Sequence, residues 1–275
     1  MPGPETKIVD HYDTGGLYDR IIAALADTGV SADAITADHL RNIDEFHIGG
    51  GAATAALLDP LNIGPGTRVL DIGSGVGGPA RFMNARYDAD VTGIDLTPDF
   101  VATAQKLTAH LGQPIGFQVG SALDMPFDSG SFDLATLLHV GMNLPDKPRL
   151  FAEVARVLKP GGMFAVYDVM RFGAHPEFPL PWATLPEASF LAEPEIYLAA
   201  ADAAGFELLT RNDRGDVARK FFAEMQAKMA ESGPPAVGLP LVMGEAAPTK
   251  VANMVAGVGR GDIAPVEMIF KHRDA

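Results

Sequence analysis

A short apolar run passes directly into a glycine-rich turn in the stretch Val69-Leu70-Asp71-Ile72-Gly73-Ser74-Gly75-Val76-Gly77-Gly78-Pro79. Glycine lets the backbone turn sharply and approach a ligand closely, and the carboxyl end of the first strand is the usual binding crevice of a parallel sheet. Three of the glycines also satisfy the dinucleotide-binding pattern G-x-G-x-x-G, so the turn alone leaves its ligand open. It predicts a strand, a ligand-binding loop and a helix in succession.

Short apolar runs alternate with helical stripes on both sides of this turn, which is typical of a parallel sheet covered by helices on both faces. The helices carry start and stop signals, such as the N-cap Thr97 before Pro98 and the stop Pro160-Gly161-Gly162 after a stripe that ends at Leu158. We therefore expect an α/β fold with a doubly wound sheet. The expected strands are 68–72, 91–95, 115–120, 132–138, 163–169, 206–210 and 266–271.

The chain divides by pattern into a helical cap, 1–60, and a core, 61–275, which carries insertions at about 172–194 and 212–263. The cap contains 10 Asp and Glu against 3 Lys and Arg, so it holds half of the net charge of −14. It is interpreted either as a solvated face or as a lid that closes over a ligand. The insertions lie where a doubly wound sheet keeps its loops, so we expect them on the substrate side.

Composition excludes several classes of protein. With 47% hydrophobic residues in 275, the chain can bury a full core, and its acidity without a basic cluster argues against nucleic acid or a membrane surface as partner. The absence of cysteine excludes disulfides, a thiolate nucleophile and metal sites built on thiolates. The first residues lack a secretory signal pattern and no run is long enough to span a membrane, so a cytoplasmic protein is predicted.

Segments beyond the glycine turn separate the possible ligands. Asp95 ends the next expected strand, where its two oxygens can accept hydrogen bonds from both hydroxyls of a ribose. The Tyr-x-x-x-Lys pair of one large dehydrogenase class is absent. In order and spacing, the segments 120–127, 131–134 and 157–162 resemble the class I S-adenosylmethionine-dependent methyltransferases. The resemblance implies a seven-stranded, mostly parallel, Rossmann-like sheet with the last strand antiparallel, S-adenosylmethionine as cofactor and S-adenosylhomocysteine as product.

Several further stretches of sequence narrow the resemblance. The chain looks similar to the sarcosine/dimethylglycine N-methyltransferase group in Phe46-His47, Gly77–Arg81, Val91–Pro98, His139–Asn143, Tyr167–Val169 and Pro179–Ala183. This likeness implies that the turn at Gly73 to Gly75 holds the methionine part of the cofactor and that Asp95 holds the ribose. It also implies that Leu96 lies beside the adenine and that Ser121 and Ala122 flank its edge. The implied cofactor-binding residues are Asp71, Gly73, Ser74, Gly75, Asp95, Leu96, Ser121, Ala122 and His139. Ser121 departs from the family pattern, in which an Asp usually stands at this position, and weaker adenine selection is one expected consequence.

His139 is the candidate catalytic base, because it closes the fourth strand beside the crevice and an imidazole titrates near neutral pH. A structural or cofactor-shaping histidine is the alternative. Arg171 is the only Lys or Arg between Lys159 and Arg211, so it is the one cation with which that segment could grip a carboxylate. The other candidate substrate residues are Tyr12, Tyr18, His47, Met142 and Trp182. Simple packing is the alternative role for the two tyrosines and Trp182, and a hydrogen bond to the backbone is the alternative for His47.

The function predicted from these patterns is methyl transfer by in-line displacement to a nitrogen, oxygen or carbon nucleophile of a small molecule. The acceptor is expected to be an amine or amino acid such as sarcosine or dimethylglycine, or a larger apolar or aromatic compound. A nicotinamide-dependent oxidoreductase and a cofactor-binding protein without turnover are the alternatives from other classes. No metal site is predicted, because no two of the seven histidines stand at i, i+4. The oligomeric state is left open, with a homodimer among the options.

Overall fold

The computed structural model describes residues 4–13, 15–233, 235 and 237–273. Seven strands of this part form one sheet in the order β3-β2-β1-β4-β5-β7-β6, in which β7 alone is antiparallel to its neighbours. The strands are β1 (Arg68–Ile72), β2 (Asp90–Asp95), β3 (Gly116–Val119), β4 (Phe132–Leu138), β5 (Leu158–Arg171), β6 (Phe206–Asp213) and β7 (Ile263–His272). The predicted α/β class and the mostly parallel seven-stranded sheet are confirmed.

Strand β5 corrects one predicted boundary. The stripe of Phe151, Val154 and Leu158 predicts a helix that continues to Leu158, but helix α7 (Lys147–Val157) ends one residue earlier. Leu158 instead pairs with Phe132 of β4, and β5 runs through Pro160 and the two following glycines as far as Arg171. A register shift between Phe132 and Leu134 accommodates this irregular start. Pairing between neighbouring strands therefore prevails over the local stop signal.

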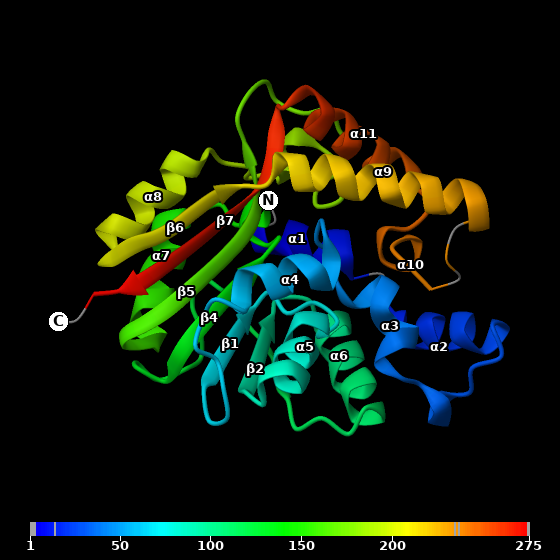
Figure 1. The fold of residues 1–275 in the computed structure, drawn as a ribbon, viewed down its shortest axis with the longest axis horizontal. Helices are drawn as coiled ribbons and strands as arrows, with labels where there is room; N and C mark the ends of the chain where they lie inside the picture. The colour runs from blue at the N-terminus through cyan, green and yellow to red at the C-terminus, as the bar shows by residue number, and fades with distance from the viewer. Residues whose placement is uncertain (1–3, 14, 234, 236, 274–275) are drawn as a thin grey trace.

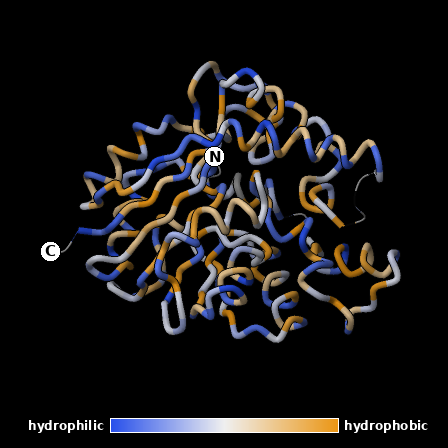
Figure 2. The backbone as a smooth tube through the Cα atoms, viewed as in Figure 1, coloured by the Kyte–Doolittle hydropathy of each residue, from blue (hydrophilic) through white to orange (hydrophobic). Residues whose placement is uncertain are grey.

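Helices cover both faces of the sheet. Because successive strand residues point to opposite sides, each central strand contributes side chains to an apolar core on both faces. Val69 joins one apolar core under helices α4 (Gly50–Leu58), α5 (Gly78–Tyr87) and α6 (Pro98–His110). Leu70 joins the other core under α7 and α8 (Pro194–Ala203). Figure 2 shows hydrophobic residues along the central strands, while the outer helices alternate between hydrophobic and hydrophilic turns.

The remaining helices lie beside the sheet (Figure 1). Before the core come α1 (Pro4–Tyr12), α2 (Leu17–Asp27), α3 (Ala37–Asp44) and the 3-10 turn η1 (Ala32–Ala34). Two further 3-10 turns, η2 (Gly141–Asn143) and η3 (Pro186–Ala188), follow β4 and β5. The second predicted insertion consists mainly of helix, namely α9 (Gly215–Ser232), α10 (Pro240–Met243) and α11 (Ala247–Arg260).

Helices of the predicted cap pack on the core. Leu17, Ile21 and Leu25 of α2 bury their side chains with Phe100 and Leu107 of α6 in one apolar cluster. An ion pair of 2.5 Å between Arg81 of α5 and Asp44 of α3 fixes the next cap helix. Helix α4, which the sequence assigns to the cap, lies on the sheet itself, and the division at residue 60 stays a prediction. In the described ranges, no helix is long and apolar enough to cross a membrane.

Candidate functional site

A cavity of about 1920 Å³ opens at the carboxyl ends of β1, β2 and β4. The sheet order places β2 on one side of β1 and β4 on the other, so the order of the strands reverses at β1. Ligands of open α/β sheets usually bind at such a switch point. Its volume exceeds the 300–1,000 Å³ that is typical of a single small-molecule pocket. The cavity therefore has room for two ligands side by side.

The glycine turn forms the floor of this cavity at the end of β1. Gly73 and Gly75 line the cavity and have positive φ angles of 70° and 53°, a conformation that glycine adopts at no steric cost. A side chain at position 73 would meet Val140, which follows β4, at 2.3 Å. The turn thus keeps bare backbone at the crevice because β1 and β4 approach closely there.

Asp95 at the end of β2 holds the turn in place. One carboxylate oxygen accepts the Gly75 N–H at 2.9 Å and the other accepts the Thr97 N–H at 2.8 Å. Burial raises the pKa of Asp95 above its ordinary value, although these backbone donors oppose the shift. The two oxygens form an acceptor pair at the end of β2, of the kind that suits ligand hydroxyls. Leu96 and Ala122 line the cavity beyond Asp95. The bare backbone of the turn, the two acceptor oxygens of Asp95 and the apolar surface of Leu96 and Ala122 therefore fit an adenosyl group.

Two of the predicted cofactor residues lie behind the turn instead of in the cavity lining. Asp71 is buried in β1, and its one bonded oxygen accepts the Thr136 hydroxyl at 2.8 Å. Burial raises the pKa of Asp71 to about 7. Ser74 is also buried, with a hydroxyl that has no protein partner in the described part of the chain. Both residues are therefore placed to support the turn from beneath.

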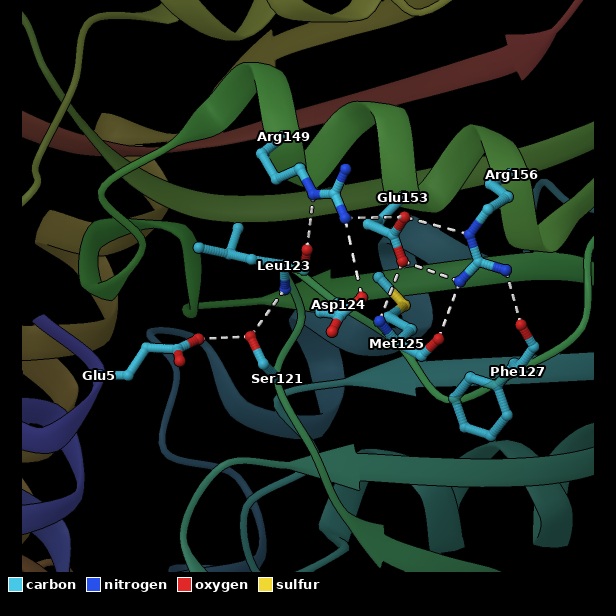
Figure 3. A network of polar contacts seen from close by, with 9 residues as sticks. All are labelled: Glu5, Ser121, Leu123, Asp124, Met125, Phe127, Arg149, Glu153 and Arg156. Atoms are coloured by element: carbon cyan, nitrogen blue, oxygen red, sulfur yellow. Dashed lines mark hydrogen bonds and ion pairs between the residues drawn. The ribbon is translucent and has the colours of Figure 1, made fainter. Parts of the chain in front are cut away.

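Ser121 follows β3 and belongs to a polar network that Figure 3 shows. Its hydroxyl donates a hydrogen bond to Glu5 of helix α1 and accepts the Leu123 N–H at 3.0 Å. Farther along the same loop, Arg156 binds the carbonyls of Met125 and Phe127 at 2.8 and 2.6 Å. The loop that follows β3 is thereby held to α7 at one end and to the cap at the other.

His139 closes β4 with an unusual backbone. Its φ of 56° lies in the left-handed region, which costs energy for a residue with a side chain and is often found at functional sites. The residue lines the cavity, and its buried Nε2 has no hydrogen-bond partner among the residues described. Burial, and then the neighbouring His47, lower the pKa of His139 well below its ordinary value. The imidazole is therefore neutral at pH 7.

His47 also lines the cavity and is fixed by acceptors. Its Nε2 lies 3.1 Å from the Gly50 carbonyl, 3.0 Å from the Thr54 hydroxyl and 3.0 Å from Glu45. The Thr54 proton is donated to Glu45 at 2.7 Å, so all three neighbours accept, and this network assigns the Nε2 proton to His47. The ring packs edge-on to His139 with a centroid distance of 5.8 Å.

The acceptor half of the cavity is mainly apolar. Met142 of η2 and Trp182 are buried and line it, and the Trp182 Nε1–H donates to Ser189 at 2.9 Å. Further lining side chains come from α9, α10 and α11: Phe221, Phe222, Met225, Leu239, Val242, Met243, Met254 and Val255. Tyr12 closes the cap side, with its hydroxyl 3.5 Å from Asn143 Oδ1.

Two predicted substrate residues lie elsewhere. Tyr18 of α2 bonds His110 of α6 at 2.7 Å and stacks on its ring, so it joins the cap to the core outside the cavity lining. Arg171 pairs with Glu193 at 2.6 Å and also donates to the Gly173 carbonyl. The structure thus places the cation of that segment in an ion pair outside the cavity lining.

Sequence reasoning missed Tyr167 and Glu5 as site residues. Tyr167 is buried in β5, stacks on His139 with a centroid distance of 5.4 Å, and keeps its hydroxyl without a partner in the ranges described. Its position in the strand next to β4, where it pairs with Leu138 just before His139, is the signal that could have identified it. Glu5 is brought to the cavity by a helix more than 100 residues away in sequence, and no local pattern marks it.

In the part of the chain that the structure describes, no group of three or more His, Asp or Glu side chains is arranged to hold a metal ion. The absence of a metal from the chemistry stays a prediction.

Residues 70–166 match the family model described as methyltransferase domain. Methyltransferase GfsG of Streptomyces halstedii is 28% identical over 184 residues, which cover 65% of this chain and 66% of that protein. Phosphoethanolamine N-methyltransferase 3 of Arabidopsis thaliana is 30% identical over 168 residues, which cover 61% of this chain and 34% of that protein. The chain thus matches between about a third and two thirds of the length of these relatives.

Solved structures share the fold over the whole chain. Geranyl diphosphate C-methyltransferase from Streptomyces coelicolor A3(2), in complex with Mg²⁺, geranyl diphosphate and S-adenosylhomocysteine, has a TM-score of 0.71 and 19% identity, and the alignment covers 99% of this chain and 98% of that one. At this identity the likeness shows the fold alone. A tocopherol O-methyltransferase and a sterol 24-C-methyltransferase are also among the matched proteins.

Proposed function

We propose, from the premise that this chain carries a class I S-adenosylmethionine-dependent methyltransferase domain, that it methylates a small molecule with a largely apolar body. The observation that carries this proposal is the two-part cavity. Its cofactor half consists of Gly73, Gly75, Asp95 and Leu96, and its other half is lined mainly by Trp, Phe, Met, Leu and Val side chains. The narrower likeness to the sarcosine/dimethylglycine group stays a prediction.

The cofactor supplies, when bound, a methyl group on a sulfonium sulfur that a nucleophile can take by in-line displacement. The residues of this chain need only hold two ligands at the correct distance and exclude water, which is the larger part of catalysis in a reaction of this kind. Tyr12 of the cap and Trp182 of the loop after β5 line the cavity from two sides. We infer that these walls enclose the acceptor beside the turn of Gly73.

His139 is the residue that we assign to proton transfer. The acceptor's oxygen or nitrogen loses a proton when it becomes methylated, and a neutral imidazole at the cavity wall can take that proton. The lowered pKa of His139 keeps it neutral at pH 7, and its stacking on Tyr167 holds the ring in one orientation. His47, which carries its proton at Nε2, is inferred to position the ring of His139 without exchanging protons.

An apolar acceptor is favoured over an amino acid by the charges around the cavity. A carboxylate substrate requires a free cation, but Arg171 is paired with Glu193 outside the lining. Of the cations that line the cavity, Arg41, Arg81 and Arg86 pair with Asp38, Asp44 and Asp59, and the remaining one, Lys228 of α9, is exposed. The Trp, Phe and Met side chains of the lining would instead bury a hydrocarbon or aromatic body, at about 25 cal/mol for each Å² removed from water.

A panel of acceptors with release of S-adenosylhomocysteine as readout tests the proposal. We expect turnover with phenols, aromatic amines or terpenoid alcohols and little with sarcosine or dimethylglycine. Turnover restricted to the two amino acids would contradict the apolar acceptor. His139→Ala should lower kcat about 100-fold or more, and the exposed histidine variant His175→Ala is the matched control. An unchanged kcat in His139→Ala would remove His139 as the base.

The pH profile of the wild-type enzyme tests the same assignment. Because the pKa of His139 is lowered, the neutral base should persist below pH 6.5, and the acid limb of kcat should lie below that pH. The nicotinamide-dependent alternative has no support from the match over 70–166. The cytoplasmic location, the absence of nucleic-acid and membrane partners, and the oligomeric state stay predictions.

A further inference from the structure

Helix α1 lies against the cavity and carries an acidic side chain to its cofactor half. Glu5 lines the cavity together with Leu96 and Ala122, two of the three positions expected at the adenine, while the third, Ser121, lies just outside the lining. In Figure 3, its carboxylate points from the cap toward the hydroxyl of Ser121. Two segments that are 116 residues apart in sequence therefore meet at this end of the cavity.

The hydrogen bonds at Ser121 determine which group can accept a hydrogen bond from a ligand. The Ser121 hydroxyl has one proton, which it donates to Glu5, and its oxygen already accepts the Leu123 N–H at 3.0 Å. The hydroxyl thus already acts as a donor to Glu5 and as an acceptor for the Leu123 N–H. Glu5 has two carboxylate oxygens with about four acceptor sites and no proton to donate when ionised. The carboxylate is the stronger acceptor for an N–H donor that enters this end of the cavity.

Nearby cations have other partners. Arg156 binds Glu153 at 2.8 Å, and Arg149 lies 3.6 Å from Glu153 and 3.7 Å from Asp124 (Figure 3). Of the contacts drawn in that view, Glu5 makes the one to Ser121. Neither arginine drawn in this network contacts Glu5, whose carboxylate is held at the cavity lining by the Ser121 hydroxyl.

We propose that Glu5 is a cofactor-binding residue, whose carboxylate accepts a hydrogen bond from the exocyclic amino group of the adenine of S-adenosylmethionine. The inference rests on the cofactor of the proposed function and is independent of the methyl acceptor. Position 121, where an Asp is expected from the resemblance, is Ser in this chain, and Glu5 supplies the carboxylate from the cap. Ser121 acts as a positioning residue for Glu5.

The same contact ties cofactor binding to the position of the cap. At its other end, α1 places the His11 imidazole 3.2 Å from the Pro181 carbonyl and Tyr12 beside the acceptor half. An adenine bound to Glu5 would hold α1 at both ends across the cavity. The cofactor then completes one wall of the acceptor site before the acceptor arrives.

Calorimetric titration of the full chain with two ligands, without any methyl acceptor, tests the proposal. The ligands are S-adenosylhomocysteine and S-inosylhomocysteine, in which a carbonyl oxygen replaces the amino group. The wild type should bind the adenosyl ligand at least tenfold more tightly, because a hydrogen bond to a charged group is at stake. Glu5→Ala should lose about tenfold in affinity for the adenosyl ligand and none for the inosyl ligand, whose oxygen faces the carboxylate unfavourably.

Further variants distinguish a direct contact from a general loss of the cap. Ser121→Asp added to Glu5→Ala should restore the preference for adenosine, and Glu5→Gln, which preserves the packing of α1, should lose less than Glu5→Ala. Asp19→Ala removes an exposed carboxylate of the same cap and should bind both ligands as the wild type does.

The outcomes separate the two proposals. An equal loss of affinity for both ligands in Glu5→Ala, or no loss for either, would overturn the role of Glu5 while leaving the methyltransferase function intact. A folded wild type that binds neither ligand would overturn the cofactor assignment as well.

Discussion

A methyl group at position 73 would probe the close approach of β1 and β4 that builds the cofactor crevice. In Gly73→Ala, the new Cβ would lie 2.3 Å from Cγ2, 2.7 Å from Cγ1 and 3.1 Å from Cβ of Val140. Ordinary van der Waals contact begins at 3.4 Å, so the nearest methyl group has to move by about 1.1 Å. Val140 directly follows His139, and its displacement is therefore transmitted to the candidate base.

Two terms contribute to the expected loss of stability. The positive φ of 70° at position 73 costs an alanine about 1 kcal/mol, and overpacking against Val140 adds about 1–3 kcal/mol. Gly112→Ala is the matched control, because Gly112 has a φ of 65° and no atom within 4 Å of the added Cβ. We expect Gly73→Ala to lower the free energy of unfolding by about 2–4 kcal/mol and Gly112→Ala by about 1 kcal/mol.

Urea unfolding of both variants measures these losses, and titration with S-adenosylhomocysteine reports on the crevice. The double variant Gly73→Ala/Val140→Ala should recover the steric part of the loss, so the two changes should couple in a double-mutant cycle. Equal losses in Gly73→Ala and Gly112→Ala, or simple additivity in the cycle, would refute the steric argument. Gly112→Ala should leave the affinity for S-adenosylhomocysteine unchanged.

Three other variants test separate parts of the site. Asp71→Asn should flatten the pH dependence of stability. In the wild type, the folded chain keeps the Asp71 proton up to a pKa of about 7, whereas the unfolded chain loses it near 3.8. The free energy of unfolding of the wild type should therefore fall as pH rises between these two values, by at most about 1.4 kcal/mol per pH unit. A pH series of urea melts shows the difference. Arg81→Met leaves the buried carboxylate of Asp44 unpaired and should lower the free energy of unfolding by about 3 kcal/mol, as followed by thermal melting. Arg171→Ala removes the pair with Glu193 and the hydrogen bond to the Gly173 carbonyl, both outside the cavity lining, and should keep kcat/KM within twofold, whereas a large rise in KM would restore Arg171 as a substrate residue.

The fold could be predicted because its signals are local. The turn at 73–75 and the helix start at Thr97-Pro98 each specify backbone geometry within a few residues, and the sheet follows from their alternation. The exception at Leu158 has a non-local cause, since its pairing with Phe132 is formed by a strand 26 positions earlier. Strand pairing is a tertiary property that outweighs the stop signal of Pro160.

The candidate site was predictable to the same extent. Residues that follow strands, such as Asp95 and His139, were placed at the crevice because all parallel strands end at one edge. Arg171 has the same kind of position after β5, but its side chain pairs with Glu193, and a partner so distant in sequence leaves no local trace. Glu5 shows the reverse case, in which a helix outside the motif supplies a polar group to the cavity.

The division of the cavity explains why a clear domain match leaves the acceptor open. In the proposed division, the cofactor half takes the turn at Gly73, Asp95 and the loop at Ala122 from residues 70–166, which match the methyltransferase domain. The acceptor half takes Met142 from that region and its other walls from α1, from the loop that carries Trp182, and from α9 to α11, all outside it. Relatives of this chain are named as methyltransferases of phosphoethanolamine, a tocopherol and a sterol, so a likeness in this domain does not determine the acceptor. We therefore expect selectivity in this chain to depend on the apolar walls around Trp182 and Phe222, which lie outside the matched domain.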